Sequence, residues 1–300
     1  MRKNNCLSCA ILLQSEVLMT AGIWYFSGTG NSWWVAHRLG DILTNKGLIT
    51  EVRSIERAGA EETSRQIEAY DIIGFVYPIY GSDLPLIMKE FLASLPCTST
   101  EKPVFLCCTQ WLFSGDGTRA ALEFLEGRHF NVRWSEHISM PNNVCISLIR
   151  LPYSNDRRKI GKFLGRAERR LERFAEHIFR DMPRLKGFSR WSAFLGSLQR
   201  SPFRKYYDRL RNDIAVDPSR CTSCGLCVEI CPSRNLSMAE DGRIAVHGKC
   251  ILCVRCYNFC PASAVTYMGR KHIMERGVPY RGPEPCSPAD IIAGKHPSKT

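Results

Sequence analysis

The chain carries one cysteine pattern twice. Residues 221–232 read CTSCGLCVEICP, and residues 250–261 read CILCVRCYNFCP. Both stretches follow the spacing C-x2-C-x2-C-x3-C-P and together contain eight of the 15 cysteines. The repeat predicts one small β-α-β-like unit written twice, which accounts for roughly residues 213–270.

This spacing is typical of bacterial ferredoxins that hold two [4Fe–4S] clusters. Three cysteines of one run curl around one side of a cluster, and the fourth, before proline, reaches the other cluster. The spacing predicts one cluster on Cys221, Cys224, Cys227 and Cys260, and a second on Cys250, Cys253, Cys256 and Cys231.

Zinc and disulfides are the alternative uses of these cysteines. Zinc ribbons use paired cysteines rather than a triple followed by a fourth before proline. Disulfides need an oxidising compartment, and the sequence gives no support for export. We therefore expect a cytoplasmic protein whose thiols stay reduced.

Composition allows two domains. The 300 residues are 44% hydrophobic, and no apolar run approaches the ~20 residues that a membrane-spanning helix needs. Residues 1–21 faintly suggest a signal peptide, but their apolar stretch is short and runs into Gln14 and Glu16. We expect a disordered extension, or translation that starts at Met19.

The amino-terminal half opens with a phosphate-site pattern. Residues 22–26, GIWYF, predict a strand, and residues 27–32, SGTGNS, form a Gly/Ser/Thr loop before a helical pattern. Glycines and hydroxyls at a helix amino terminus surround an anion with donors. The loop is neither a Walker loop nor G-x-G-x-x-G, and it suits a phosphate monoester; a plain tight turn is the alternative.

Strands and helices then alternate. Further strands are predicted at 52–55, 71–77, 103–108 and 131–138, with helices at 84–95 and 118–126. This pattern predicts a doubly wound, parallel, five-stranded α/β sheet. Ligands of such sheets bind beyond the carboxyl ends of the strands, where loops 27–32, 77–82 and 109–117 fall.

Residues 26–32, FSGTGNS, resemble the FMN-phosphate loop of flavodoxins, and the order of elements over 22–139 resembles that fold. Joined to the cysteine runs, the chain resembles the flavodoxin–ferredoxin fusion proteins of anaerobic bacteria and archaea. Residues 140–143, MPNN, resemble an M-P-x-N stretch of that family. The resemblance implies FMN, two [4Fe–4S] clusters and electron transfer.

The same resemblance implies the flavin contacts. Phosphate contacts fall on Ser27, Gly28, Thr29, Gly30, Asn31 and Ser32. Ring contacts fall on Pro78, Ile79, Tyr80 and Gly81, and on Thr109, Gln110, Trp111, Gly115, Asp116 and Gly117. Tyr80 and Trp111 are the candidates for stacking on the ring; as an alternative, these aromatic side chains pack on neighbouring helices.

The positive charge is concentrated between the two units. The net charge is +12, and residues 156–211 alone carry 17 basic and 6 acidic side chains, a difference of +11. Residues 159–182 predict an amphipathic helix, and a second helical pattern after Gly187 is broken at Pro202. The arginines could simply face water, or they could meet an acidic redox protein, a membrane surface or nucleic acid.

We expect an extension at 1–21, a flavodoxin-like FMN domain at 22–155, a basic helical connector at 156–211, an α+β two-[4Fe–4S] ferredoxin domain at 212–275 and a loosely ordered Pro-rich tail at 276–300. We expect electron transfer between clusters and FMN, by an electron carrier with an acidic redox partner and without nucleic acid. The alternative is a flavin-dependent reductase of a small substrate, although no catalytic residue stands out.

Overall fold

The computed structural model describes residues 18–143, 156–267, 279–283 and 286–297. Residues 1–17 of the expected extension lie outside this set, and the first strand already begins at Thr20. None of the helices in these ranges combines the length and apolarity needed to cross a bilayer.

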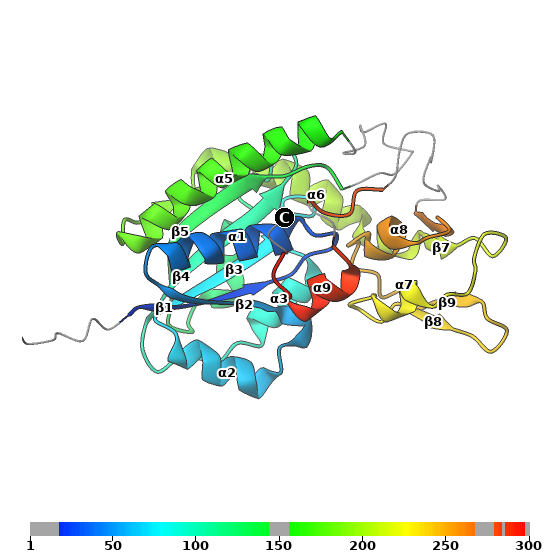
Figure 1. Cartoon of the computed structure of the whole chain (residues 1–300), viewed down its shortest axis with the longest axis horizontal. Coiled ribbons are helices and arrows are strands. Elements are labelled where there is room, and N and C mark those ends of the chain that lie inside the picture. Colours follow the sequence, from blue (N-terminus) through cyan, green and yellow to red (C-terminus); the bar gives the residue numbers. More distant parts are fainter. Residues whose placement is uncertain (1–17, 144–155, 268–278, 284–285, 298–300) are drawn as a thin grey trace, which may run out of the picture.

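One parallel sheet forms the amino-terminal unit (Figure 1). Its strands are β1 (Thr20–Tyr25), β2 (Ile49–Ser54), β3 (Ile72–Pro78), β4 (Lys102–Gln110), β5 (Phe130–Ser139) and β6 (Arg184–Leu185). They lie in the order β2-β1-β3-β4-β5-β6. The first five strands follow the 2-1-3-4-5 order of flavodoxin-like doubly wound sheets, which confirms the predicted fold class. The short sixth strand, contributed by the expected connector, was not predicted.

Helices cover both faces of this sheet. On one face lie α1 (Asn31–Asn45) and α5 (Arg157–Phe179). The other face carries α2 (Ala60–Ala69), α3 (Leu86–Ala93) and α4 (Leu122–Leu125). Every residue of the central strand β3 is buried, as expected for a strand with helices on both sides.

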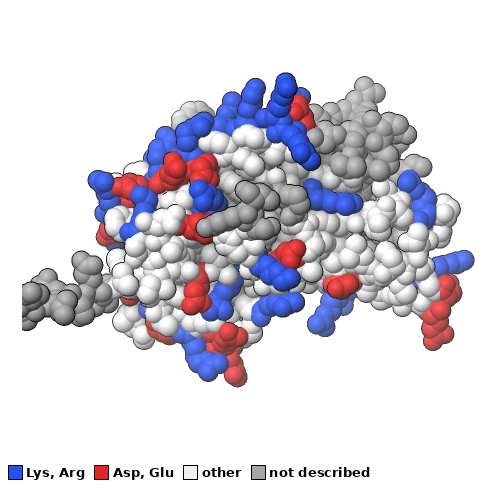
Figure 2. Space-filling model, in the orientation of Figure 1, with Lys and Arg blue, Asp and Glu red and all other residues white. Residues whose placement is uncertain are grey.

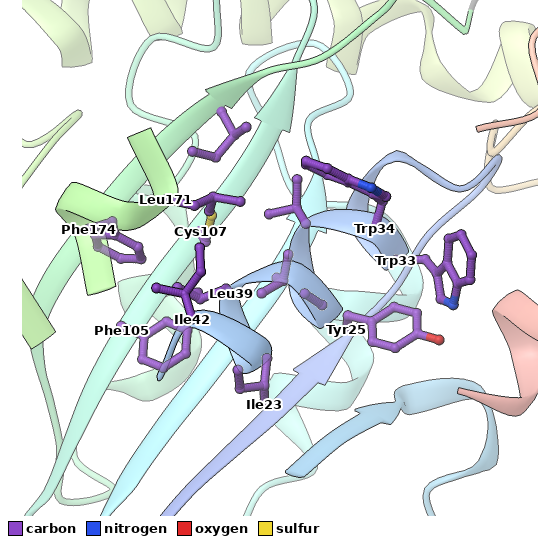
Figure 3. Packing of buried hydrophobic residues seen from close by; sticks show 14 of the residues in the cluster. Ile23, Tyr25, Trp33, Trp34, Leu39, Ile42, Phe105, Cys107, Leu171 and Phe174 are labelled. Carbon is purple, nitrogen blue, oxygen red and sulfur yellow. The ribbon is translucent and has the colours of Figure 1, made fainter. Parts of the chain in front are cut away.

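The core between α1, α5 and the sheet is tightly filled (Figure 3). Leu39 and Ile42 of α1 and Leu171 of α5 pack toward β4. Phe174 meets Phe105 edge to face, with ring centroids 5.9 Å apart, a geometry that aromatic quadrupoles favour. Cys107 is fully buried there, as a small hydrophobe.

Helix α5 belongs to this α/β layer. Asp156 caps its amino terminus by accepting hydrogen bonds from the backbone of Arg158 and Lys159. Its apolar stripe is buried at Ala167, Leu171, Phe174, Ala175 and Ile178. Packing therefore continues across the domain boundary that we expected at residue 155. Lys and Arg side chains project along the outer side of the helix (Figure 2).

The expected break at Pro202 does not occur. Helix α6 runs from Arg190 to Asn212 through this proline, although proline removes one backbone hydrogen bond. Arg200 pairs with Asp116 on one side of Pro202, and Arg204 pairs with Asp83 on the other. These two anchors hold the turns that flank the proline against the sheet's loops.

The cysteine-rich unit lies beside the carboxyl edge of the sheet (Figure 1). It contains β7 (Ile214–Val216) paired with β10 (Val265–Tyr267), and β8 (Leu236–Met238) paired with β9 (Ile244–Val246), both antiparallel. Each cysteine run forms one short helix, α7 (Leu226–Glu229) or α8 (Arg255–Phe259). This small α+β repeat matches the expectation from the sequence.

The tail is partly folded, so the expectation of loose order is wrong for residues 286–297. Helix α9 (Pro288–Ala293) begins with a capping box between Ser287 and Asp290. Ile291 is fully buried, and its carbonyl accepts a hydrogen bond from the Tyr25 hydroxyl at 2.6 Å. This packing ties the tail to the edge of the flavodoxin-like unit.

We predict that Phe174→Ala destabilises the α/β unit by about 3–5 kcal/mol, because it removes a buried aromatic ring and leaves a cavity. Phe179→Ala on the same helix is the matched control, since that ring is 47% exposed and its loss leaves no buried void. Urea unfolding followed by circular dichroism measures both. Equal, small effects of the two substitutions would show that α5 is not part of the core.

Candidate functional site

A cavity of about 660 Å³ lies at the carboxyl edge of the sheet. The expected loops after β1, β3 and β4 form much of its wall, as the topology of doubly wound sheets requires. From these loops the lining residues are Ser27, Gly28, Thr29, Asn31, Ser32, Pro78, Ile79, Tyr80, Gly81, Thr109, Gln110 and Trp111.

Four of the expected residues lie behind this wall. Gly30 has φ +105° and packs against Gly282, where a Cβ would lie 2.9 Å from the Gly282 Cα. Gly115 and Asp116 contact helix α6, and the Asp116 carboxylate pairs with Arg200. Gly117 packs against the side chain of Ile79 in the loop after β3. These residues shape the loops and do not face the cavity.

The hydroxyls of the loop after β1 are arranged to donate to an anion. Ser27 Oγ accepts a hydrogen bond from the backbone of Gly30 at 3.1 Å, and Thr29 Oγ1 accepts one from Asn143 Nδ2 at 2.9 Å. Because both oxygens act as acceptors, their own hydrogens can be donated to a phosphate. Ser32 Oγ is 2.8 Å from Thr109 Oγ1.

Helix α1 begins in the same loop. Its first turn contains no acidic residue, and its N-cap, Gly30, provides no side-chain cap. The amino-terminal N–H groups and the helix dipole therefore favour an anion at this end. The combination of loop hydroxyls and helix terminus fits one phosphate group.

Two of the lining residues carry buried polar atoms. The Tyr80 hydroxyl and the Gln110 Oε1 are buried without a hydrogen-bond partner within the described residues. Buried polar groups of this kind are costly unless something pairs with them. A flavin, with an apolar ring and polar edges, suits the remaining mixed lining.

Several lining residues were missed by the sequence reasoning. Helix α6 contributes Gln199, Phe203 and Leu210, and the cysteine-rich unit contributes Leu252, Val254 and Tyr267. They come from parts of the chain far from the three loops, so local patterns could not place them. The cavity is completed by Leu112, Phe113, Pro141, Asn142 and Asn143, of which the last three fall in the M-P-x-N stretch.

The described cavity wall contains no acid–base side chain that titrates near neutral pH, since Asp, Glu, His, Lys, Arg and Cys are all absent from its lining residues. Burial raises the pKa of Tyr80 well above its ordinary value, which keeps its hydroxyl protonated. His137 lies elsewhere, between Ser114 and Thr118, and burial lowers its pKa to about 3. Two hydroxyls hold its ring in place, so it has a structural role.

The eight cysteines of the two runs surround two separate hollows. One hollow is lined by Cys221, Cys224, Cys227 and Cys260. The other is lined by Cys231, Cys250, Cys253 and Cys256. Each hollow is lined by three cysteines of one run and the fourth cysteine of the other. Four cysteine thiolates are the ligand set of a [4Fe–4S] cluster. Within the described residues no group of three or more Cys, His, Asp or Glu is arranged to hold a metal ion, so cluster ligation stays a prediction from the spacing.

The two quartets differ in exposure. In the second, Cys250, Cys253 and Cys256 are buried, whereas in the first Cys224 is exposed. Burial raises the pKa of the Cys253 thiol to about 12.

Cys253 of the second quartet lies against the loop after β1. A Cβ on Gly28 would lie 2.5 Å from the carbonyl oxygen of Cys253 and 3.1 Å from the Tyr80 hydroxyl. Only glycine allows this approach of the two loops. The flavin-type cavity and the second quartet are therefore direct neighbours.

Comparisons with known proteins gave one family match and several structural similarities. A family model described as a 4Fe-4S dicluster domain matches residues 211–266. No curated protein matches the chain. Among solved structures, an archaeal flavodoxin is 18% identical, with 53% of this chain and 99% of that chain covered and a TM-score of 0.36. Megasphaera elsdenii flavodoxin is 24% identical, with 41% of this chain and 90% of that chain covered and a TM-score of 0.36. The flavodoxin of Streptococcus pneumonia TIGR4 is 19% identical, with 54% of this chain and 99% of that chain covered and a TM-score of 0.39.

The assignment of the amino-terminal unit rests on its strand order, 2-1-3-4-5, and on the position of its cavity. The assignment of the carboxyl-terminal unit rests on the cysteine runs and the dicluster match. The chain thus joins a doubly wound α/β unit with a flavodoxin-like strand order to a unit that matches a 4Fe-4S dicluster domain over residues 211–266.

Proposed function

We propose that the protein transfers electrons between two [4Fe–4S] clusters and FMN, and that it serves as an electron carrier for a protein partner. The contact of the buried quartet with the phosphate loop is the observation that carries this proposal. When bound, clusters move one electron each and FMN takes one or two, while the protein holds, spaces and tunes them.

A reductase acting on a small substrate is less well supported. Such chemistry usually needs a positioned acid or base beside the flavin. The described cavity wall offers only the high-pKa tyrosines Tyr80 and Tyr267. This lining favours a site that holds a flavin and exchanges electrons without proton chemistry on a substrate.

For FMN binding, we predict that Thr29→Val with Ser32→Ala lowers the affinity at least about tenfold, because each hydroxyl bond to a charged phosphate contributes roughly 1.5–3 kcal/mol. Equilibrium dialysis with FMN measures the effect. Ser64→Ala is the control, since that hydroxyl bonds only to the backbone of its own exposed helix. Unchanged FMN affinity in the double variant would show that this loop does not bind the phosphate.

For the clusters, we predict that Cys231→Ala damages the cluster at Cys250, Cys253 and Cys256 and spares the other one, because the fourth thiolate comes from the other run. Electron paramagnetic resonance of the reduced protein distinguishes the two clusters. Cys260→Ala is the matched variant and affects the opposite cluster. Damage confined to the Cys221 cluster in the Cys231 variant would refute crossed ligation.

For the partner, we propose an acidic redox protein that meets the basic outer side of α5. We predict that electron transfer with this partner slows steeply as ionic strength rises. Arg166, Arg169 and Arg173 are exposed, and reversing all three to Glu should slow transfer further at low salt with unchanged cofactor spectra.

Arg170 is left out of this variant because it bonds the His137 carbonyl at 3.1 Å and approaches Glu136, so its loss would disturb packing. Stopped-flow mixing at a series of salt concentrations measures the rates. An electron-transfer rate that changes neither with salt concentration nor on charge reversal would contradict the proposal of an acidic partner. Retention on anionic vesicles or on nucleic acid would point to a different role for this face.

A further inference from the structure

Arg255 joins the cysteine-rich unit to the phosphate loop. It is the first residue of α8, between Cys253 and Cys256, and its side chain is completely buried. Its Nη2 donates to the Ser27 carbonyl at 2.7 Å, and its Nε donates to the Gly28 carbonyl at 3.1 Å. One guanidinium of the cluster-binding run therefore bonds two successive carbonyls of the loop.

These bonds orient the loop's amides. A trans peptide is planar, and its C=O and N–H groups point in opposite directions. With the carbonyls of Ser27 and Gly28 turned toward Arg255, the N–H groups of Gly28 and Thr29 are turned away from it. Because these residues line the cavity, their N–H groups are presented to the place where the phosphate loop would hold its anion.

Glu56 fixes the guanidinium in place. Its carboxylate accepts from Arg255 Nη1 at 2.7 Å and from Nη2 at 2.6 Å. Arg255 Nη1 also donates to the carbonyl of Ile230 at 3.0 Å. A bidentate pair with carbonyl acceptors satisfies a buried charge that would otherwise be expensive. Glu56 belongs to the flavodoxin-like unit, just after β2, so the pair crosses between the units.

The far end of the loop is linked to α8 through Tyr280 of the tail. Asn258 Nδ2 of α8 donates to the Asn143 carbonyl at 3.0 Å and to the Tyr280 carbonyl at 2.8 Å. The Tyr280 hydroxyl donates to Asn31 Oδ1 at 2.7 Å. The loop is thus braced from outside, whereas a phosphate site usually relies on its own turn and helix.

We propose that Arg255 is a positioning residue for the flavin phosphate, and that the ferredoxin-like unit thereby sets the preference of the cavity for FMN over riboflavin. The inference rests on the proposed FMN site. It assigns to the second cysteine run a task besides cluster ligation, since the residue between two of its ligands organises the anion-binding amides of the neighbouring unit.

The test compares two flavins that differ only in the phosphate. FMN and riboflavin dissociation constants are measured by anaerobic equilibrium dialysis against the full chain with its clusters assembled. In Arg255→Met the amides lose their orientation. Each lost hydrogen bond from an amide to the charged phosphate lowers the affinity for FMN. We expect FMN affinity to fall at least about tenfold and riboflavin affinity to change less than about twofold.

Two further variants separate this effect from general damage. Glu56→Gln loosens Arg255 from the flavodoxin-like side without changing any residue of the cysteine runs, and should weaken FMN binding selectively by a smaller factor. Arg128→Met is the matched control, because Arg128 also donates to backbone carbonyls, including that of Ala93 at 2.7 Å, but lies outside the cavity wall. Iron and sulfide are counted in every variant, and Arg255→Lys should recover part of the FMN affinity.

The outcomes are distinct. A wild-type chain that binds neither flavin, or both equally, would contradict the proposed FMN site itself. A wild-type preference for FMN that persists in Arg255→Met and Glu56→Gln would overturn the role of Arg255. Equal loss of FMN and riboflavin in Arg255→Met would also overturn it, since the side chain would then only hold the two units together.

Discussion

The buried ion pair between Arg255 and Glu56 is the contact on which the arrangement of the two units depends. It buries a full guanidinium, at 0% side-chain exposure, against a carboxylate at 6%. Removing either partner would leave a buried charge unpaired, which typically costs several kcal/mol. Because Arg255 also bonds two carbonyls of the phosphate loop, the same pair that joins the units also shapes the flavin-type cavity.

Helix α6 forms another part of the cavity wall. Arg200 and Arg204 attach it to Asp116 and Asp83, while Phe203 lies against Gly81 so closely that a Cβ there would be 2.2 Å from the ring. The cavity is therefore built from three parts of the chain: the sheet's loops, α6 and the cysteine-rich unit. Two of the connector's positive charges hold this assembly together, while those of Arg166, Arg169 and Arg173 face solvent.

Sequence reasoning was strongest where the signal is local. The run at 22–32 predicted a strand, a turn and a helix start, which the structure has, and the cysteine spacing predicted the domain type that the family model matches. It failed where contacts between residues far apart in the chain determine the local structure. Pro202 was expected to end a helix that its flanking arginines hold in place, and the tail folds because Ile291 finds a buried position. No sequence pattern indicated the role of Arg255, because its partners Glu56 and Ser27 lie about 200 residues away in the chain.

We propose that one chain holds FMN and two iron–sulfur clusters at adjoining sites. Anaerobic purification followed by counting of iron, acid-labile sulfide, zinc and flavin per chain tests it most directly. We expect about eight iron, about eight sulfide and about one FMN per chain, since each cubane contributes four of each inorganic atom. Stoichiometric zinc without sulfide, or iron–sulfur clusters in a chain that takes up no flavin, would contradict it.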